Sequence, residues 1–139
     1  MDQAFEDVIY ACADIRIQNN QETWLVEEMI YAYINLHNEG FAHSVECWKD
    51  DKLAGGLYGI SLGRCFFGES MFTYINDASK IALVTLSNYL SALNFDFIDC
   101  QITTEHLISM GGFEISRKSF LNQLYLSLQK PSITGRWHF

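Results

Sequence analysis

The chain has 139 residues, of which 49% are hydrophobic and 19% charged, a composition typical of a folded globular domain and not of a disordered segment. Acidic residues number 17 against 9 basic ones, and the net charge of −8 argues against a broad, non-specific grip on nucleic acid. No run approaches the ~20 apolar residues that cross a bilayer, and no signal peptide is recognisable. We expect one domain over residues 1–139, in the cytoplasm and away from membranes.

Two amphipathic helices are predicted first along the chain. The apolar residues from Phe5 to Cys12 follow the i, i+3, i+4, i+7 spacing of a helix with one buried face. A second helix follows Trp24 and Leu25, and Gly40 is placed to end it.

Three antiparallel strands are predicted next. Residues 43–48 are extended and half apolar, and residues 49–52 have the polar composition of a hairpin turn. The turn leads into a second strand over residues 53–62, and a third strand covers residues 64–72.

A central helix follows, which Asn76 or Asp77 can cap and which runs to about residue 93. Core packing is the ordinary explanation of a leucine stripe on such a helix, and a binding pocket is the alternative. The stripe consists of Leu83, Leu86, Leu90 and Leu93.

The strand predicted over residues 95–101 carries the most informative residues. Because side chains alternate along a strand, Phe97, Asp99 and Gln101 project to one face. Ile98 and Cys100 point to the other face. Two polar groups on one side of an apolar run suit a cleft, although an ordinary surface end of the strand is the alternative.

The remaining segments complete the predicted order. A short helix covers residues 104–109, residues 113–115 are extended, and residues 120–128 fit a helix or a strand. A three-strand meander followed by a strand–helix–strand unit indicates an α/β (α+β) fold with a mixed, mostly antiparallel sheet flanked by helices. This order fits the GNAT-like acyltransferase fold.

The cysteines and histidines are scattered. Cys12, Cys47, Cys65 and Cys100 form no Cys-x-x-Cys pair, and the four histidines are equally isolated. Because zinc sites usually show paired ligands at short spacing, we expect no metal site and free thiols in a reducing compartment.

Several segments in a fixed order carry a specific likeness. They are Ala32-Tyr33 with Leu36-His37, Ala42-His43-Ser44-Val45-Glu46 with Trp48, Gly55-Gly56-Leu57-Tyr58-Gly59, Phe67-Gly68-Glu69-Ser70-Met71-Phe72, Ala78-Ser79-Lys80, Ile98-Asp99-Cys100-Gln101, His106-Leu107 with Ser109, and Glu114-Ile115 with Arg117. Through these segments the sequence resembles the bacterial leucyl/phenylalanyl-tRNA–protein transferase family, over nearly the whole chain.

The resemblance implies an enzyme, an aminoacyltransferase that moves leucine or phenylalanine from aminoacyl-tRNA to an acceptor protein with an N-terminal Arg or Lys. The added residue marks the acceptor for degradation, as in an N-degron pathway. The implied partners are the 3′ aminoacyl-adenosine end of the tRNA and the acceptor protein.

The resemblance also assigns site residues. Asp99 and Gln101 match the family's catalytic pair, Glu69 matches an acid of the acceptor site, and Trp24 matches a tryptophan beside the aminoacyl-adenosine end. The residues expected to line the apolar pocket for the transferred side chain are Leu57, Phe66, Leu83, Leu86 and Leu90.

The third strand is expected to be irregular. Phe66 and Glu69 stand three residues apart, so a regular strand would send them to opposite faces, although the resemblance puts both in the site. We expect a bulge near Gly68 that resets the alternation. The alternative for Glu69 is a structural pairing with Lys80 or Arg64.

These residue types suit aminolysis of an ester. An amino-terminal group has a pKa of ~7.7–8.0, so a weak base such as Asp99 suffices near neutral pH. Gln101 either donates a hydrogen bond to the developing oxyanion or orients the amine. Glu69 and Asp99 together suit a cationic Arg or Lys side chain.

No cofactor is expected. An acetyltransferase of this fold cradles the coenzyme A pyrophosphate on a glycine-containing loop, whereas residues 74–79 here contain no glycine and include Asp77.

One departure from the family bears on tRNA binding. The family normally carries a further N-terminal domain and a basic stretch before the first helix, and neither is found in this sequence. We therefore expect weak binding of whole aminoacyl-tRNA, little better than that of a short aminoacyl-adenosine mimic. A non-catalytic relative that binds an aminoacyl end or a basic N-terminus is the alternative function.

Overall fold

A computed structural model describes residues 1–18 and 25–138 of the chain. Its helices and strands are, in chain order, α1 (Phe5–Gln18), α2 (Glu27–Asn38), β1 (Ala42–Lys49), β2 (Lys52–Leu62), β3 (Cys65–Thr73), α3 (Ala78–Ala92), β4 (Phe97–Asp99), α4 (Glu105–Ser109) and α5 (Arg117–Leu128). The predicted N-terminal helices, antiparallel strands, central helix and short helix are confirmed. The last predicted strand is wrong, because residues 113–115 form no strand and the segment beyond them is helical.

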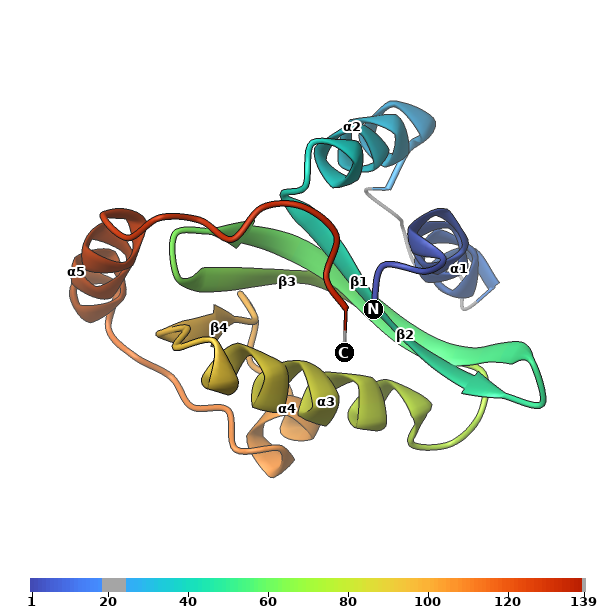
Figure 1. Cartoon of the computed structure of the whole chain (residues 1–139). Helices are drawn as coiled ribbons and strands as arrows, with labels where there is room; N and C mark the ends of the chain where they lie inside the picture. The colour runs from blue at the N-terminus through green and yellow to red at the C-terminus, as the bar shows by residue number, and fades with distance from the viewer. Residues whose placement is uncertain (19–24, 139) are drawn as a thin grey trace.

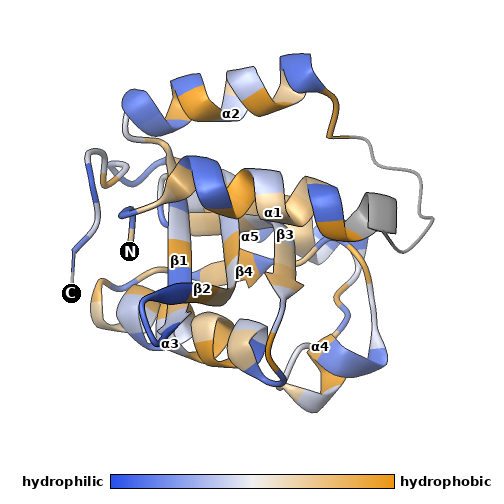
Figure 2. Cartoon of the chain, turned by 90° about the vertical axis from the view of Figure 1, so that its right-hand side faces the viewer, coloured by the Kyte–Doolittle hydropathy of each residue, from blue (hydrophilic) through white to orange (hydrophobic). Residues whose placement is uncertain are grey.

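The elements form three layers (Figure 1). The sheet has the order β1-β2-β3-β4, with antiparallel pairing up to β3 and a parallel pairing of β3 with β4. Helices α1 and α2 cover one face, α3 covers the other, and the side view in Figure 2 shows the same arrangement. The mixed, mostly antiparallel sheet predicted from the sequence is therefore confirmed. No helix among the described residues is long and apolar enough to cross a membrane.

Two apolar clusters hold the layers together. The cluster under α1 and α2 includes Phe5, Ile9, Tyr33, Tyr58 and Phe72. The cluster between the sheet and α3 includes Leu57, Phe66, Leu86, Leu90 and Trp137. Because apolar burial contributes roughly 25 cal/mol per Å², these clusters are the main source of stability for the layered arrangement.

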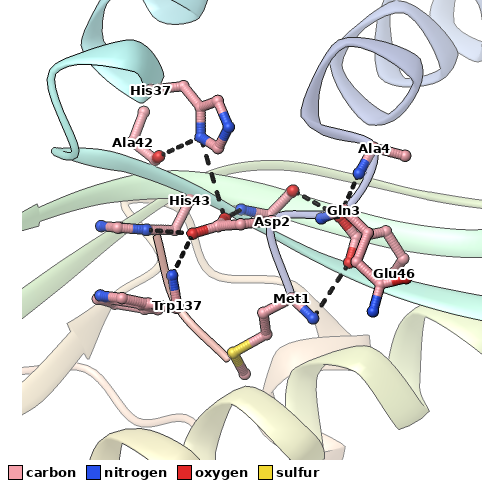
Figure 3. A network of polar contacts seen from close by, with 10 residues as sticks. Met1, Asp2, Gln3, Ala4, His37, Ala42, His43, Glu46 and Trp137 are labelled. Atoms are coloured by element: carbon pink, nitrogen blue, oxygen red, sulfur yellow. Dashed lines mark hydrogen bonds and ion pairs between the residues drawn. The ribbon is translucent and has the colours of Figure 1, made fainter. Parts of the chain in front are cut away.

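The outer edge of β1 is covered by residues from both ends of the described chain (Figure 3). The main-chain N–H of Asp2 donates to the Ser44 carbonyl at 3.1 Å. The Asp2 carboxylate accepts from the N–H groups of Ser44 at 2.8 Å and Trp137 at 2.7 Å, and lies 2.9 Å from His43 Nδ1. The Trp137 indole stacks on the His43 ring with centroids 3.6 Å apart. This edge of the sheet is thereby closed around Ser44.

Candidate functional site

Strand β3 contains the predicted bulge. Neighbouring residues of β2, Tyr58 and Gly59, pair with Ser70 and Gly68, so Glu69 has no partner across the ladder. A bulge inserts one extra residue and re-aims the side chain at that point. The prediction of a bulge near Gly68 is confirmed, and Glu69 is the extra residue.

The bulge does not bring Phe66 and Glu69 to one face, and this expectation is wrong. The Tyr33 hydroxyl of α2 donates to Glu69 Oε2 at 2.9 Å. Phe66 is fully buried and belongs to the cluster with Leu86 of α3, on the opposite face of the sheet. The irregularity directs Glu69 toward α2, so the two residues stay on different sides of β3.

The alternative pairings of Glu69 are also wrong. The Lys80 ammonium lies 2.6 Å from Asp77 Oδ1, and the Arg64 guanidinium lies over the Phe95 ring at 5.8 Å from its centroid. Glu69 therefore has a tyrosine partner, Tyr33, which no periodic pattern of the sequence indicates.

The pKa of Glu69 depends on burial and on the charge of Asp99. Burial of the half-buried carboxyl raises the pKa of Glu69, and the negative charge of Asp99 raises it further, against the opposing effect of the hydrogen bond from Tyr33. Burial, and then the same hydrogen bond, raise the pKa of Tyr33, so its hydroxyl remains a donor. The two carboxyl groups therefore interact electrostatically.

Asp99 ends β4, and Gln101 does not continue the strand as predicted. The main-chain N–H of Gln101 donates to Asp99 Oδ1 at 2.9 Å, and Gln101 has a φ of 64°, in the left-handed region. A short aspartate that captures the N–H two residues on turns the chain. Asp99 and Gln101 remain neighbours through this turn, not through strand alternation.

Asp99 and Gln101 line a cleft of about 1020 Å³. The cleft runs along β4 between α3, α4, the segment of residues 110–116 and α5. A hydrogen bond of 2.6 Å from Thr103 Oγ1 to Glu114 Oε1 joins two of its walls. Apolar side chains dominate the walls, among them Leu83, Leu90, Ile98, Leu107, Phe113 and Phe120. Phe97 at the base stacks edge-on against Phe120 at 5.9 Å.

The predicted pocket residues separate into two groups. Leu83 and Leu90 line the cleft. Leu57, Phe66 and Leu86 are buried in the core beneath it and are absent from its lining. The lining therefore supports substrate contact by Leu83 and Leu90, whereas contact by the other three residues rests on the resemblance alone. Trp24 lies outside the described residues.

The charges along the cleft are mostly negative. Its lining contains the acids Asp96, Asp99 and Glu114 and the base Arg117. Asp96 is paired with Lys130, whose ammonium lies 2.5 Å from Asp96 Oδ1. Within the described residues 1–18 and 25–138, no basic side chain forms an ion pair with Asp99, so its carboxylate stays available to a cationic ligand.

A second, smaller cavity of about 620 Å³ lies where β3 ends and α3 begins. Lys80 and His106 line it together with Asp77, which neutralises the Lys80 charge. This cavity contains none of the predicted site residues.

The fold has counterparts among solved structures. Two structures of an aminoglycoside acetyltransferase from an uncultured soil metagenomic sample, with trehalose and with sisomicin, superpose with TM-scores of 0.52 and 0.54 at 11% and 9% identity. Each alignment covers 99% of this chain and 87% or 89% of the other chain. The GNAT-like acyltransferase fold expected from the sequence is therefore confirmed.

Comparison of the sequence identifies the family of the chain, and not only its fold. Residues 1–125 match the family described as leucyl/phenylalanyl-tRNA protein transferase, and the chain belongs to this family. Leucyl/phenylalanyl-tRNA–protein transferases of Desulforapulum autotrophicum, Desulfatibacillum aliphaticivorans and Legionella pneumophila are 60%, 53% and 52% identical to it. The alignments cover 100%, 99% and 99% of this chain. The chain spans 61%, 59% and 61% of the length of these relatives.

Proposed function

We propose that this chain transfers leucine or phenylalanine from aminoacyl-tRNA to the N-terminal Arg or Lys of an acceptor protein, in the cytoplasm, and so marks the acceptor for degradation. The observation that carries the proposal is the cleft along β4, with apolar walls and Asp99 in its lining, in a chain matched to the family over residues 1–125. An apolar wall beside an acid suits an apolar donor and a cationic acceptor.

The donor side of the reaction uses the apolar walls. Leu83, Leu90 and Ile98 offer aliphatic contacts to a leucine or phenylalanine side chain. Such a surface discriminates by only ~1–3 kcal/mol per methylene, which is consistent with acceptance of two amino acids of different shape. Trp24, through the resemblance, is assigned to the aminoacyl-adenosine end.

The acceptor side uses the two carboxyl groups. A cationic Arg or Lys side chain and the α-ammonium relieve the repulsion that Asp99 exerts on Glu69. Once the ammonium has lost a proton, the amine nitrogen attacks the ester carbonyl carbon. The new C–N bond forms, the C–O bond to the terminal ribose breaks, and the second amine proton passes to the ribose oxygen, which leaves as a hydroxyl group.

Asp99 and Gln101 act on this proton movement and on charge. Asp99 attracts the ammonium and acts as the base that takes up its first proton before the amine attacks. The Gln101 side chain is exposed in the same cleft, where its amide donates to the oxyanion or orients the amine. The turn that ties Gln101 to Asp99 keeps both residues at the end of β4.

The test is a transfer assay with labelled phenylalanyl-tRNA and a peptide that begins with Arg. A peptide of the same sequence with an acetylated N-terminus is the matched control, because it lacks only the nucleophilic amine. We expect label to enter the first peptide and not the second. Binding of both substrates without any transfer would contradict the proposal and indicate a non-catalytic relative.

A further inference from the structure

The outer edge of β4 has no partner strand among the described residues. In the order β1-β2-β3-β4, β4 is the last strand and pairs only with β3 (Figure 1). An open strand edge presents unpaired N–H and C=O groups, which can add a further extended chain.

The direction of these main-chain groups follows from one hydrogen bond. The N–H of Asp96 donates to the Arg64 carbonyl at 2.7 Å, so the main-chain groups of Asp96 face β3. Successive residues of a strand direct their main-chain groups to opposite edges. The N–H and C=O of Phe97 therefore point outward.

This open edge faces the cleft. Residues 95–101, which include the whole of β4, belong to its lining. The cleft is negatively charged overall, and Asp99 stands at the C-terminal end of β4. A chain that starts with an ammonium and a cationic side chain complements this charge when its first residue lies at Asp99.

We propose that the first residues of the acceptor bind as an added strand, antiparallel to β4, with residue 1 opposite Asp99 and residue 3 opposite Phe97. This proposal rests on the proposed function and adds how the acceptor main chain is held. In this register, the N–H and C=O of residue 3 pair with the C=O and N–H of Phe97.

The register is consistent with where the acids lie. Residues directly opposite each other in a sheet project to the same face. Asp99 pairs with Phe67, so its side chain lies on the face of the sheet opposite to Phe66. Glu69 lies on the same face as Asp99, the face that α2 covers. The first side chain of the acceptor, Arg or Lys, therefore points to the side of the sheet on which Asp99 and Glu69 lie.

The test uses peptides beginning with Arg that carry a single N-methyl group on the main chain. Methylation at residue 3 removes the N–H that pairs with Phe97 and adds bulk at the strand edge. Methylation at residue 4, whose N–H points away from β4, is the matched control. We expect the residue 3 peptide to raise the acceptor KM by about tenfold and the control to change it by less than about twofold.

A protein variant tests the same contact from the other side. Phe97→Pro removes the outward N–H of an edge strand, where proline is tolerated, and Phe97→Ala removes the same ring but keeps the N–H. We expect Phe97→Pro to raise the KM of a long peptide above that of Phe97→Ala. Both variants should treat arginine amide, which has no residue 3, alike.

The two proposals fail in different ways. Transfer to all peptides with equal KM for the residue 3 and residue 4 peptides would overturn pairing on β4 and leave the transferase function intact. Absence of transfer to any acceptor, including arginine amide, would overturn the proposed function. Fluorescence anisotropy of the labelled methylated peptides then still decides the pairing, since equal affinities would overturn it.

Discussion

The two edges of the sheet differ in how their polar groups are used. At the β1 edge, Asp2 is 3% exposed and its carboxylate is engaged by Ser44, His43 and Trp137 (Figure 3). At the β4 edge, Asp99 faces a cleft, and its carboxylate accepts a hydrogen bond from the nearby main-chain N–H of Gln101. An acid whose partners are all supplied by the protein stabilises the fold, whereas an acid that lacks a basic partner can bind a substrate cation.

The largest expected effect breaks the closed edge. Asp2→Ala leaves the N–H groups of Ser44 and Trp137 unpaired in a buried place, and we expect unfolding free energy to fall by about 3–5 kcal/mol. Urea unfolding followed by circular dichroism measures it. A loss below about 1 kcal/mol would mean that this network adds little stability.

The second prediction separates core from cleft along α3. Leu86 is 1% exposed, so Leu86→Ala should lower the unfolding free energy by about 2–5 kcal/mol and leave the ratio of phenylalanine to leucine transfer unchanged. Leu83 lines the cleft, so Leu83→Ala should cost less stability and change that ratio. Urea unfolding and a competition assay with both donors measure the pair. A larger change of ratio in Leu86→Ala would place the donor pocket beneath the cleft instead.

The third prediction removes the acid of the open edge. Asp99→Ala should lower the transfer rate at least ~100-fold, because one positioned base is lost. Asp99→Asn keeps an oxygen that accepts the Gln101 N–H but has no charge, so it should be equally slow. Single-turnover transfer by variants with native melting temperatures measures this. Full activity in Asp99→Asn would show that the transfer rate depends on the turn at Asp99 and not on the charge of its side chain.

The smallest effect is a pH dependence of stability. Burial alone would raise the pKa of Asp2. The hydrogen bonds from His43, Trp137 and Ser44 outweigh this effect, so the pKa of Asp2 is lowered. The charged form is favoured in the folded state, so this contribution is present above the ordinary carboxyl pKa of about 3.9 and is lost as pH falls toward the lowered value. His37, whose Nδ1 lies 4.0 Å from Asp2 Oδ1, also faces this group.

The pH dependence is measured by urea unfolding of the wild type and of Asp2→Asn across the acid range. The wild type should lose stability more steeply below about pH 4 than the variant does. Parallel curves for the two proteins would indicate that other carboxyl groups account for acid unfolding.

The sequence is sufficient to predict most of the helices and strands, because helical and alternating apolar patterns are local. The bulge near Gly68 was predicted on the premise that Phe66 and Glu69 share a face; the bulge is present, but the two side chains lie on opposite sides of the sheet. The sequence does not reveal that β4 ends at Asp99, because a single hydrogen bond from the Gln101 N–H to the Asp99 side chain replaces strand pairing there.

Contacts between distant residues are the other part that the sequence does not reveal. Tyr33 and Glu69 are 36 residues apart, and Asp2 and Trp137 are 135 residues apart. Both pairs form only when the sheet brings their elements together, and neither has a spacing that periodicity can detect. An aspartate near the N-terminus is expected at the surface, yet Asp2 is buried.

The central claim is that substrate binds at the open β4 edge and not at the closed β1 edge. Amide hydrogen exchange, read by mass spectrometry with and without a peptide that begins with Arg, tests it most directly. The account predicts slower exchange in residues 95–101 on addition of the peptide and unchanged exchange in residues 42–49. Protection confined to residues 42–49, or no protection at residues 95–101 under saturating peptide, would contradict it.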